Sequence, residues 1–137
     1  TSRDARTVLG EVRQRLIDDG DTRSAVDGLV ALAGCTRQAI LDGRLDRLGE
    51  LLDASWRLKR QMASKVTNGR LDVLYAEARA AGATGGKVSG AGGGGCLLLV
   101  VPEPSRAVVR NAMTRAGLKE VTFSLEPEGS RIIHYAV

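Results

Sequence analysis

The part of the chain best suited to chemistry is a glycine-rich stretch that begins at Lys87. Residues 87–101 read KVSGAGGGGCLLLVV, and five of the six residues from 90 to 95 are glycine. Glycine adopts positive φ angles readily and lets another group approach the backbone closely. Successive backbone N–H groups in such a turn can form a nest that binds an anion, typically phosphate. The stretch therefore predicts a phosphate-binding loop; the alternative is a tight turn in which two backbones pack without a ligand.

Two familiar phosphate-binding motifs do not fit this stretch. Gly90, Gly92 and Gly95 match the pattern G-x-G-x-x-G, but a dinucleotide-binding loop follows a strand and opens a helix. Here a predicted helix precedes the glycines and the apolar run 97–101 follows them, so the order is reversed. A Walker A loop needs Ser or Thr after its Gly-Lys pair, and Val88 stands there instead.

Basic and hydroxyl side chains near the glycines and further upstream could also meet a ligand. Lys87 could contact a phosphate or a substrate oxygen, or it could be the solvated end of a strand. Ser89 could donate to a ligand or only cap the turn. Arg57, Lys59 and Arg60 could meet a sugar phosphate, although a solvated helix face is the simpler interpretation. One histidine and two scattered cysteines predict no zinc site.

Helices must position this stretch, because apolar residues recur at helical spacing throughout the first half of the chain. We expect a helical layer over about residues 1–82, followed by the glycine-rich loop 85–96. Trp56 continues the apolar stripe of the third helix and is expected in the core. The first three helices are expected over residues 1–18, over 22–42 and from 45 through 56.

Glycines and one polar pair predict where the helices begin and end. Glycine often takes the left-handed conformation just after a helix, as expected for Gly20 and Gly82. Gly43 is expected to break or bend the second helix, and Gly117 to stop the helix that begins near Pro104. Thr67 or Asn68 is expected to cap a fourth helix that closes at Gly82, because short polar side chains accept hydrogen bonds from free N–H groups at helix starts.

The second half of the chain reads as strand, helix, strand, strand. The expected strands cover residues 97–101, 119–125 and 131–137, with a helix that begins near Pro104 and a hairpin turn at 126–129. This order is three quarters of a ferredoxin-like fold. The predicted fold class is therefore α+β, and the missing first strand is expected upstream of Thr1.

Composition bounds what the chain can be. Its 137 residues suffice for one domain, and 43% hydrophobic residues indicate a globular chain. No apolar run approaches the ~20 residues of a membrane span, so no membrane partner is expected. A net charge of +4 without a basic block, and with 3% aromatic residues, argues against nucleic acid. Cys35 and Cys96 are too few for a disulfide framework, and we expect reduced, packed thiols in a cytoplasmic protein.

A longer segment around the glycines carries a family resemblance. The stretch GATGGKVSGAGGGGCLLLVV, residues 82–101, resembles the third conserved motif of the GHMP kinases. Lys87, Ser89, the glycine run and Cys96 stand where that pattern puts such residues. The sequence from Trp56 to the loop is most similar to bacterial heptose-phosphate kinases of this group, whereas mevalonate kinases share the loop closely.

The resemblance implies a ferredoxin-like GHMP kinase C-terminal domain over residues 1–137, with additional N-terminal helices. It implies a kinase that uses ATP and Mg²⁺, both bound mainly by an N-terminal kinase domain whose motifs are absent here. The implied acceptor is a small sugar phosphate or alcohol, with a heptose phosphate first and mevalonate as an alternative. The implied phosphate- and substrate-binding residues are Lys87, Ser89, Gly90, Ala91, Gly92, Gly93, Gly94 and Gly95.

No catalytic residue and no metal ligand is assigned within the chain itself. We therefore expect the isolated chain to be inactive and the complete protein to be a kinase, because phosphoryl transfer needs metal ligands and a positioned nucleophile as well as a phosphate nest. The alternative from another class is a ferredoxin-like ligand-binding or interaction module without catalysis.

Overall fold

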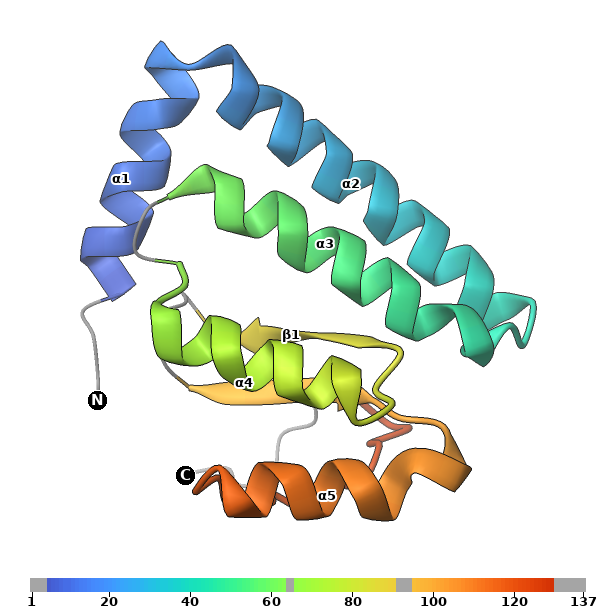
Figure 1. The fold of residues 1–137 in the computed structure, drawn as a ribbon. Helices are drawn as coiled ribbons and strands as arrows, with labels where there is room; N and C mark the ends of the chain where they lie inside the picture. Colours follow the sequence, from blue (N-terminus) through green and yellow to red (C-terminus); the bar gives the residue numbers. More distant parts are fainter. Residues whose placement is uncertain (1–4, 64–65, 91–94, 130–137) are drawn as a thin grey trace, which may run out of the picture.

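The computed structural model describes residues 5–63, 66–90 and 95–129 (Figure 1). The helices and strands are α1 (Ala5–Asp18), α2 (Gly20–Leu41), α3 (Leu48–Met62), α4 (Gly69–Ala80), β1 (Gly85–Ser89), β2 (Cys96–Val100) and α5 (Arg106–Arg115). Short 3-10 turns, Leu45–Arg47 and Glu103–Ser105, lead into α3 and α5. Helices and an antiparallel sheet in one chain confirm the α+β class.

The elements stack in layers around the small sheet. α2 and α3 lie side by side, and α3 packs on β1 (Figure 1). α5 covers the sheet on the other side, where its apolar residues pack against β2, and α4 also contacts α5. α1 meets the start of α2 at a sharp angle. β1 is thus held between a long helix and its partner strand, and it leads directly into the glycine stretch.

Most of the predicted helix ends are confirmed. Gly43, Gly82 and Gly117 have φ angles of 68°, 112° and 82° just after α2, α4 and α5. These angles favour glycine because a Cβ would be strained there. The side chain of Asn68 accepts a hydrogen bond from the backbone N–H of Leu71 at 3.0 Å, so Asn68 caps α4.

The prediction for Gly20 is wrong, because this residue begins α2 instead of ending α1. The Asp19 carboxylate accepts hydrogen bonds from the backbone N–H of Asp21 at 2.9 Å and from the hydroxyl of Thr22 at 2.7 Å. Asp19 therefore satisfies a free donor at the start of α2 as its N-cap. One residue is enough to turn the chain from α1 into α2.

The glycine stretch connects the strands of a β-hairpin, which the sequence did not predict. β1 occupies residues 85–89, which were assigned to a loop, and it pairs antiparallel with β2. The register ends with Ser89 opposite Cys96, so the connection comprises residues 90–95. The first predicted strand, 97–101, is confirmed as β2 with a shift of one residue.

Two glycines explain why β1 escaped prediction. A Cβ built on Gly85 would lie 1.8 Å from the backbone oxygen of Gly49 in α3, and one on Gly86 would lie 2.2 Å from the oxygen of Leu98 in β2. Glycine is depleted in strands, yet only glycine allows this close approach of helix and strand. Gly85 and Gly86, which allow these contacts, therefore also lower the strand propensity of residues 85–89, and for this reason the sequence did not predict β1.

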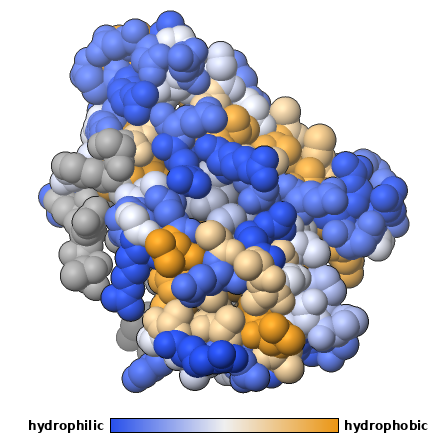
Figure 2. All heavy atoms as spheres, viewed as in Figure 1, coloured by the Kyte–Doolittle hydropathy of each residue, from blue (hydrophilic) through white to orange (hydrophobic). Residues whose placement is uncertain are grey.

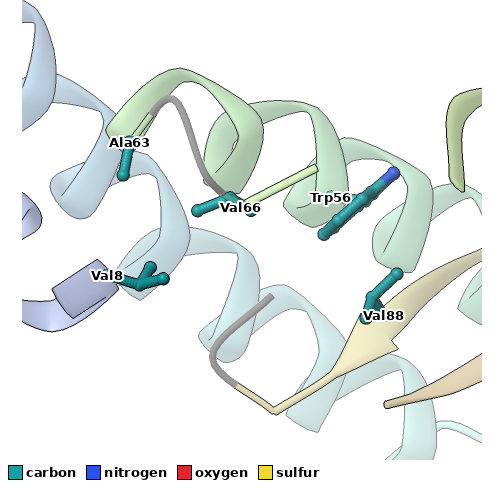
Figure 3. Close-up of a cluster of buried hydrophobic side chains, with 5 residues drawn as sticks. All are labelled: Val8, Trp56, Ala63, Val66 and Val88. Atoms are coloured by element: carbon teal, nitrogen blue, oxygen red, sulfur yellow. The ribbon is translucent and has the colours of Figure 1, made fainter. Parts of the chain in front are cut away.

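Two apolar clusters form the core against the small sheet. The first contains Val8, Trp56, Ala63, Val66 and Val88, drawn from α1, α3, the segment after α3 and β1 (Figure 3). Trp56 is 2% exposed, which confirms it as a core residue. The second cluster joins α4 and α5, and β2 packs against it. Leu97 of β2 packs against both clusters, so β1 and β2 are both anchored to the core on either side of the glycine connection.

The predicted strand at 119–125 is not present, because within the described residues this segment pairs with no other strand. Its alternating apolar residues Val121, Phe123 and Leu125 are 67%, 73% and 88% exposed. Arg110 of α5 holds the start of the segment through hydrogen bonds of 2.8 and 3.0 Å to the Glu120 carboxylate. The strand predicted at 131–137 lies outside the described residues. Alternating apolar residues predict which face of a strand is buried, but they do not predict whether a neighbouring strand is there to pair with it.

Figure 2 shows where hydrophobic residues reach one face of the surface. They gather in its lower half, over α4 and α5, where Val73 and Val108 are exposed. Cys35 and Cys96 are both free thiols, as predicted, but the prediction that they are packed is wrong. Both are exposed, Cys35 on the solvent side of α2 and Cys96 at the loop end of β2. None of the described helices is both long and apolar enough to cross a membrane.

Candidate functional site

The candidate site is built on the connection between β1 and β2. Its first and last residues, Gly90 and Gly95, have φ angles of 101° and 106°. A Cβ on Gly95 would also lie 2.7 Å from the backbone oxygen of Ser89. Both positions therefore require glycine. The other four predicted loop residues, 91–94, lie outside the described residues.

Lys59 of α3 reaches this connection from another part of the chain. Its Nζ donates a hydrogen bond of 2.6 Å to the backbone oxygen of Gly90. The side chain is half-buried. Burial, and second the positive charge of Lys87, lower the pKa of Lys59 below its usual value of 10.5. The structure thus brings two lysines to the start of the glycine connection.

Lys87 comes from β1, three residues before Gly90, and is half-buried. Alternate residues of a strand share a face, so Lys87 lies on the same side as Gly85, where α3 packs. Ser89 is exposed at the end of β1. Lys87 and Ser89 are alternate residues of β1, and Gly90 follows Ser89 directly. These three predicted residues therefore lie at one end of the hairpin.

The basic residues of α3 separate into two groups. Arg57 forms an ion pair of 2.5 Å with Asp53, and Arg60 forms one of 3.0 Å with Asp72. Of these three residues, only Lys59 has a hydrogen bond to the described part of the glycine connection, at Gly90. The interpretation of a solvated helix face thus fits Arg57 and Arg60 but not Lys59. The sequence signal that could have singled out Lys59 is weak, since the three residues are close neighbours.

A polar network supports β1 beside the two lysines. The Tyr75 hydroxyl donates to Asp53 Oδ1 at 2.6 Å and also lies 3.3 Å from the backbone oxygen of Gly86. Asp53 is 8% exposed, and Arg57 neutralises it. Burial and then the Asp53 carboxylate raise the pKa of Tyr75 far above its usual value. The network links α3, α4 and β1 at the residue that precedes Lys87.

The donor set at this site suits an anion and not a metal ion. Ammonium and backbone N–H groups donate hydrogen bonds to phosphate oxygens, whereas Mg²⁺ requires oxygen ligands. Among the described residues no three His, Cys, Asp or Glu side chains are grouped to hold a metal. The described residues at the hairpin end therefore offer donors for an anion and no grouped set of ligands for Mg²⁺.

A separate groove of about 710 Å³ lies between α2 and α3. Its lining includes Gly28, Leu32, Glu50 and Arg57, but neither Lys59 nor any of the predicted loop residues. Its side chains carry mixed charge, and part of that charge is already paired. The hairpin end, and not this groove, is where unpaired positive charge and required glycines coincide.

Comparison with known proteins agrees with the geometry. The family described as GHMP kinases C terminal matches residues 36–120. A mevalonate kinase from Thermococcus gammatolerans is 38% identical over 89 residues, which cover 65% of this chain and 26% of the relative. A D-glycero-alpha-D-manno-heptose 7-phosphate kinase from Campylobacter jejuni is 30% identical over 93 residues, or 68% of this chain and 27% of the relative.

A solved structure shows the same arrangement. The crystal structure of L. major mevalonate kinase in complex with R-mevalonate aligns with a TM-score of 0.75 and 25% identity, over 84% of this chain and 35% of that one. The chain thus spans about a quarter of the length of the curated relatives that it matches. Since the family match covers more than half of the chain, the chain belongs to the GHMP kinases C-terminal family.

Proposed function

We propose that this chain is the C-terminal part of an ATP-dependent small-molecule kinase. The single observation that carries the proposal is the glycine-connected hairpin end, where Lys59 and Lys87 bring two positive charges to backbone that requires glycine. Its family membership supports the same activity, because the relatives named above are kinases. The proposed compartment is the cytoplasm, where ATP is supplied.

In this proposal the loop lines the cleft that holds the transferred phosphoryl group or the substrate. Phosphoryl transfer depends mainly on positioning and on stabilising charge at the phosphate oxygens. Residues 90–95 supply backbone N–H groups, Lys87 supplies positive charge, and Ser89 supplies a hydroxyl donor. The Mg²⁺ ligands and the group that orients the acceptor hydroxyl belong to an N-terminal kinase domain, which is the proposed partner of this chain.

The proposed acceptor is the hydroxyl of a heptose phosphate. A heptose 7-phosphate kinase is among the relatives, and two cations at the loop suit a phosphorylated acceptor. Mevalonate is the alternative acceptor. It has support of its own, because a mevalonate kinase is 38% identical and the aligned structure is a mevalonate kinase. Both acceptors keep the same reaction, transfer of the γ-phosphoryl group of ATP to an alcohol.

Expression of the full-length protein tests the proposal. ADP release is measured with D-glycero-D-manno-heptose 7-phosphate, mevalonate and galactose as acceptors. Turnover with the heptose phosphate alone supports the proposed acceptor, whereas turnover with mevalonate alone keeps the kinase and replaces the acceptor. A folded protein that binds ATP but turns over none of the three contradicts the proposed activity on these acceptors.

A further inference from the structure

We propose that Lys59 and Lys87 together form a binding site for a phosphate monoester dianion at the entrance of the β1–β2 connection. The inference deepens the proposed function and rests on it for the identity of the ligand. It adds a residue from α3 to a loop site otherwise drawn from one stretch of sequence. The dianion is either the phosphate monoester already carried by the acceptor or the terminal phosphate of the nucleotide, which is an anhydride with the same dianionic charge.

The first argument is the contrast in charge pairing along α3. Arg57 and Arg60 flank Lys59, and each is neutralised by a carboxylate, Asp53 or Asp72. Within the described part of the chain, neither Lys59 nor Lys87 forms an ion pair. Among the described residues, two cations without acidic partners therefore lie at the start of the connection: Lys59, which is bonded to Gly90, and Lys87, three residues before Gly90 in β1.

The second argument is the position of the Lys59 ammonium group. A long lysine side chain ordinarily extends its charge into water. Lys59 is instead half-buried, and its Nζ is fixed 2.6 Å from the Gly90 oxygen. That carbonyl is neutral, so it orients the ammonium group without cancelling its charge. Burial and the like charge of Lys87 both disfavour the protonated form, and an anion bound between the lysines would relieve both effects.

The third argument is the match of charge. A phosphate monoester carries about −1.5 to −2 charges at neutral pH, which two ammonium groups balance. A single carboxylate would leave one of the lysines uncompensated. An ammonium group has three donors, so Lys59 can keep its bond to Gly90 and still donate to a phosphate oxygen. The site therefore favours a phosphorylated ligand over one that carries only a carboxylate.

Binding experiments on the full-length protein separate the possible sources of the phosphate. The probes are D-glycero-D-manno-heptose 7-phosphate, the same heptose without phosphate, and ATP, each titrated calorimetrically. The variants are Lys59→Met, Lys87→Met and the charge-conserving Lys59→Arg. The matched control is Lys119→Met, which removes a lysine charge from the exposed segment after α5.

Lys59→Met and Lys87→Met are each expected to weaken binding of a phosphorylated probe by about 10-fold to 100-fold, the usual loss for one charge-assisted hydrogen bond. Lys59→Arg retains most of the affinity, and Lys119→Met changes it less than about twofold. Binding of the unphosphorylated heptose stays unchanged in every variant. A loss confined to the heptose phosphate identifies the acceptor's phosphate as the ligand, and a loss confined to ATP identifies the nucleotide's.

Unchanged affinity for both phosphorylated probes in a folded Lys59→Met protein overturns the inference. Equal losses in Lys59→Met and Lys119→Met also overturn it, because they would reflect net charge alone. The test does not depend on turnover. A wild-type protein without kinase activity, in which Lys59→Met still loses phosphate binding, would refute the proposed function and leave this site standing.

Discussion

At the scale of single residues, the ionisation of Lys59 should report its surroundings. The pKa of Lys59 is expected to lie below the usual lysine value of 10.5 in the wild type, and Lys87→Met should raise it only in part, because burial is the larger cause. Side-chain NMR of labelled lysines measures both values. An unaltered Lys59 pKa in Lys87→Met would show that the two charges do not interact.

The sign of the stability effect follows from the lowered pKa. Between this pKa and 10.5, the unfolded chain binds more protons than the folded chain. The penalty for the charged, half-buried Lys59 is therefore complete below the lowered pKa and is relieved as the pH rises through it. Relative to Lys59→Met, the wild type should gain stability over this alkaline window, as measured by urea unfolding at a series of pH values.

Tyr75→Phe should destabilise the chain with almost no change in shape. The substitution removes the hydroxyl that donates to the buried Asp53 and leaves that oxygen without its donor, at a cost of about 1–3 kcal/mol. Because the folded pKa of Tyr75 is raised, the wild type loses this advantage as the pH rises above 10, where tyrosine ionises in the unfolded chain. Urea unfolding at neutral and alkaline pH measures the difference, and a constant difference would contradict the network.

Sequence reasoning named only part of the candidate site at this scale. The glycine-rich stretch is recognisable in the sequence, so it also pointed to the residues within or directly beside it, namely Lys87, Ser89 and Gly90. Lys59 could not be separated from Arg57 and Arg60, because its contact with Gly90 joins residues 31 positions apart. That contact depends on how α3 packs on β1, which no local pattern encodes.

At the scale of elements, the contact between α3 and β1 should tolerate no added carbon atom. In Gly85→Ala, the new Cβ would lie 1.8 Å from the Gly49 oxygen and 3.1 Å from the Asp53 Cβ. Helix or strand must shift, and we expect a loss of about 3 kcal/mol in the free energy of unfolding. Urea unfolding followed by the fluorescence of Trp56, the only tryptophan of the chain, measures it.

Gly34→Ala is the matched control for this substitution. Gly34 lies in α2, and a Cβ there meets nothing within 4 Å. Alanine favours a helix over glycine, so this variant should gain about 0.5–1 kcal/mol. If both variants were equally stable, steric contact between α3 and β1 would not be the reason that Gly85 is glycine.

The elements that were predicted are those with local signals. Asn68, Gly43, Gly82 and Gly117 mark helix ends through bonds within a few residues, and the structure has them as expected. β1 was missed because its glycines are required by contacts with other elements: Gly85 packs against Gly49 of α3, and Gly86 packs against Leu98 of β2. The strand predicted at 119–125 had the right alternation but, among the described residues, has no partner. Prediction failed where an element depends on another element far along the chain.

At the scale of the whole molecule, the chain should bind phosphate ligands better than it turns them over. It spans about a quarter of the length of its curated relatives, and its described residues offer basic and backbone donors without a grouped set of metal ligands. Phosphoryl transfer requires an anion site, metal ligands and an oriented nucleophile together. We therefore expect chain 1–137 alone to release no ADP above background with ATP, Mg²⁺ and heptose phosphate, while the full-length protein does. Trp56 fluorescence must first show that the isolated chain is folded; sugar phosphorylation by that folded chain would mean that these residues complete the active site unaided.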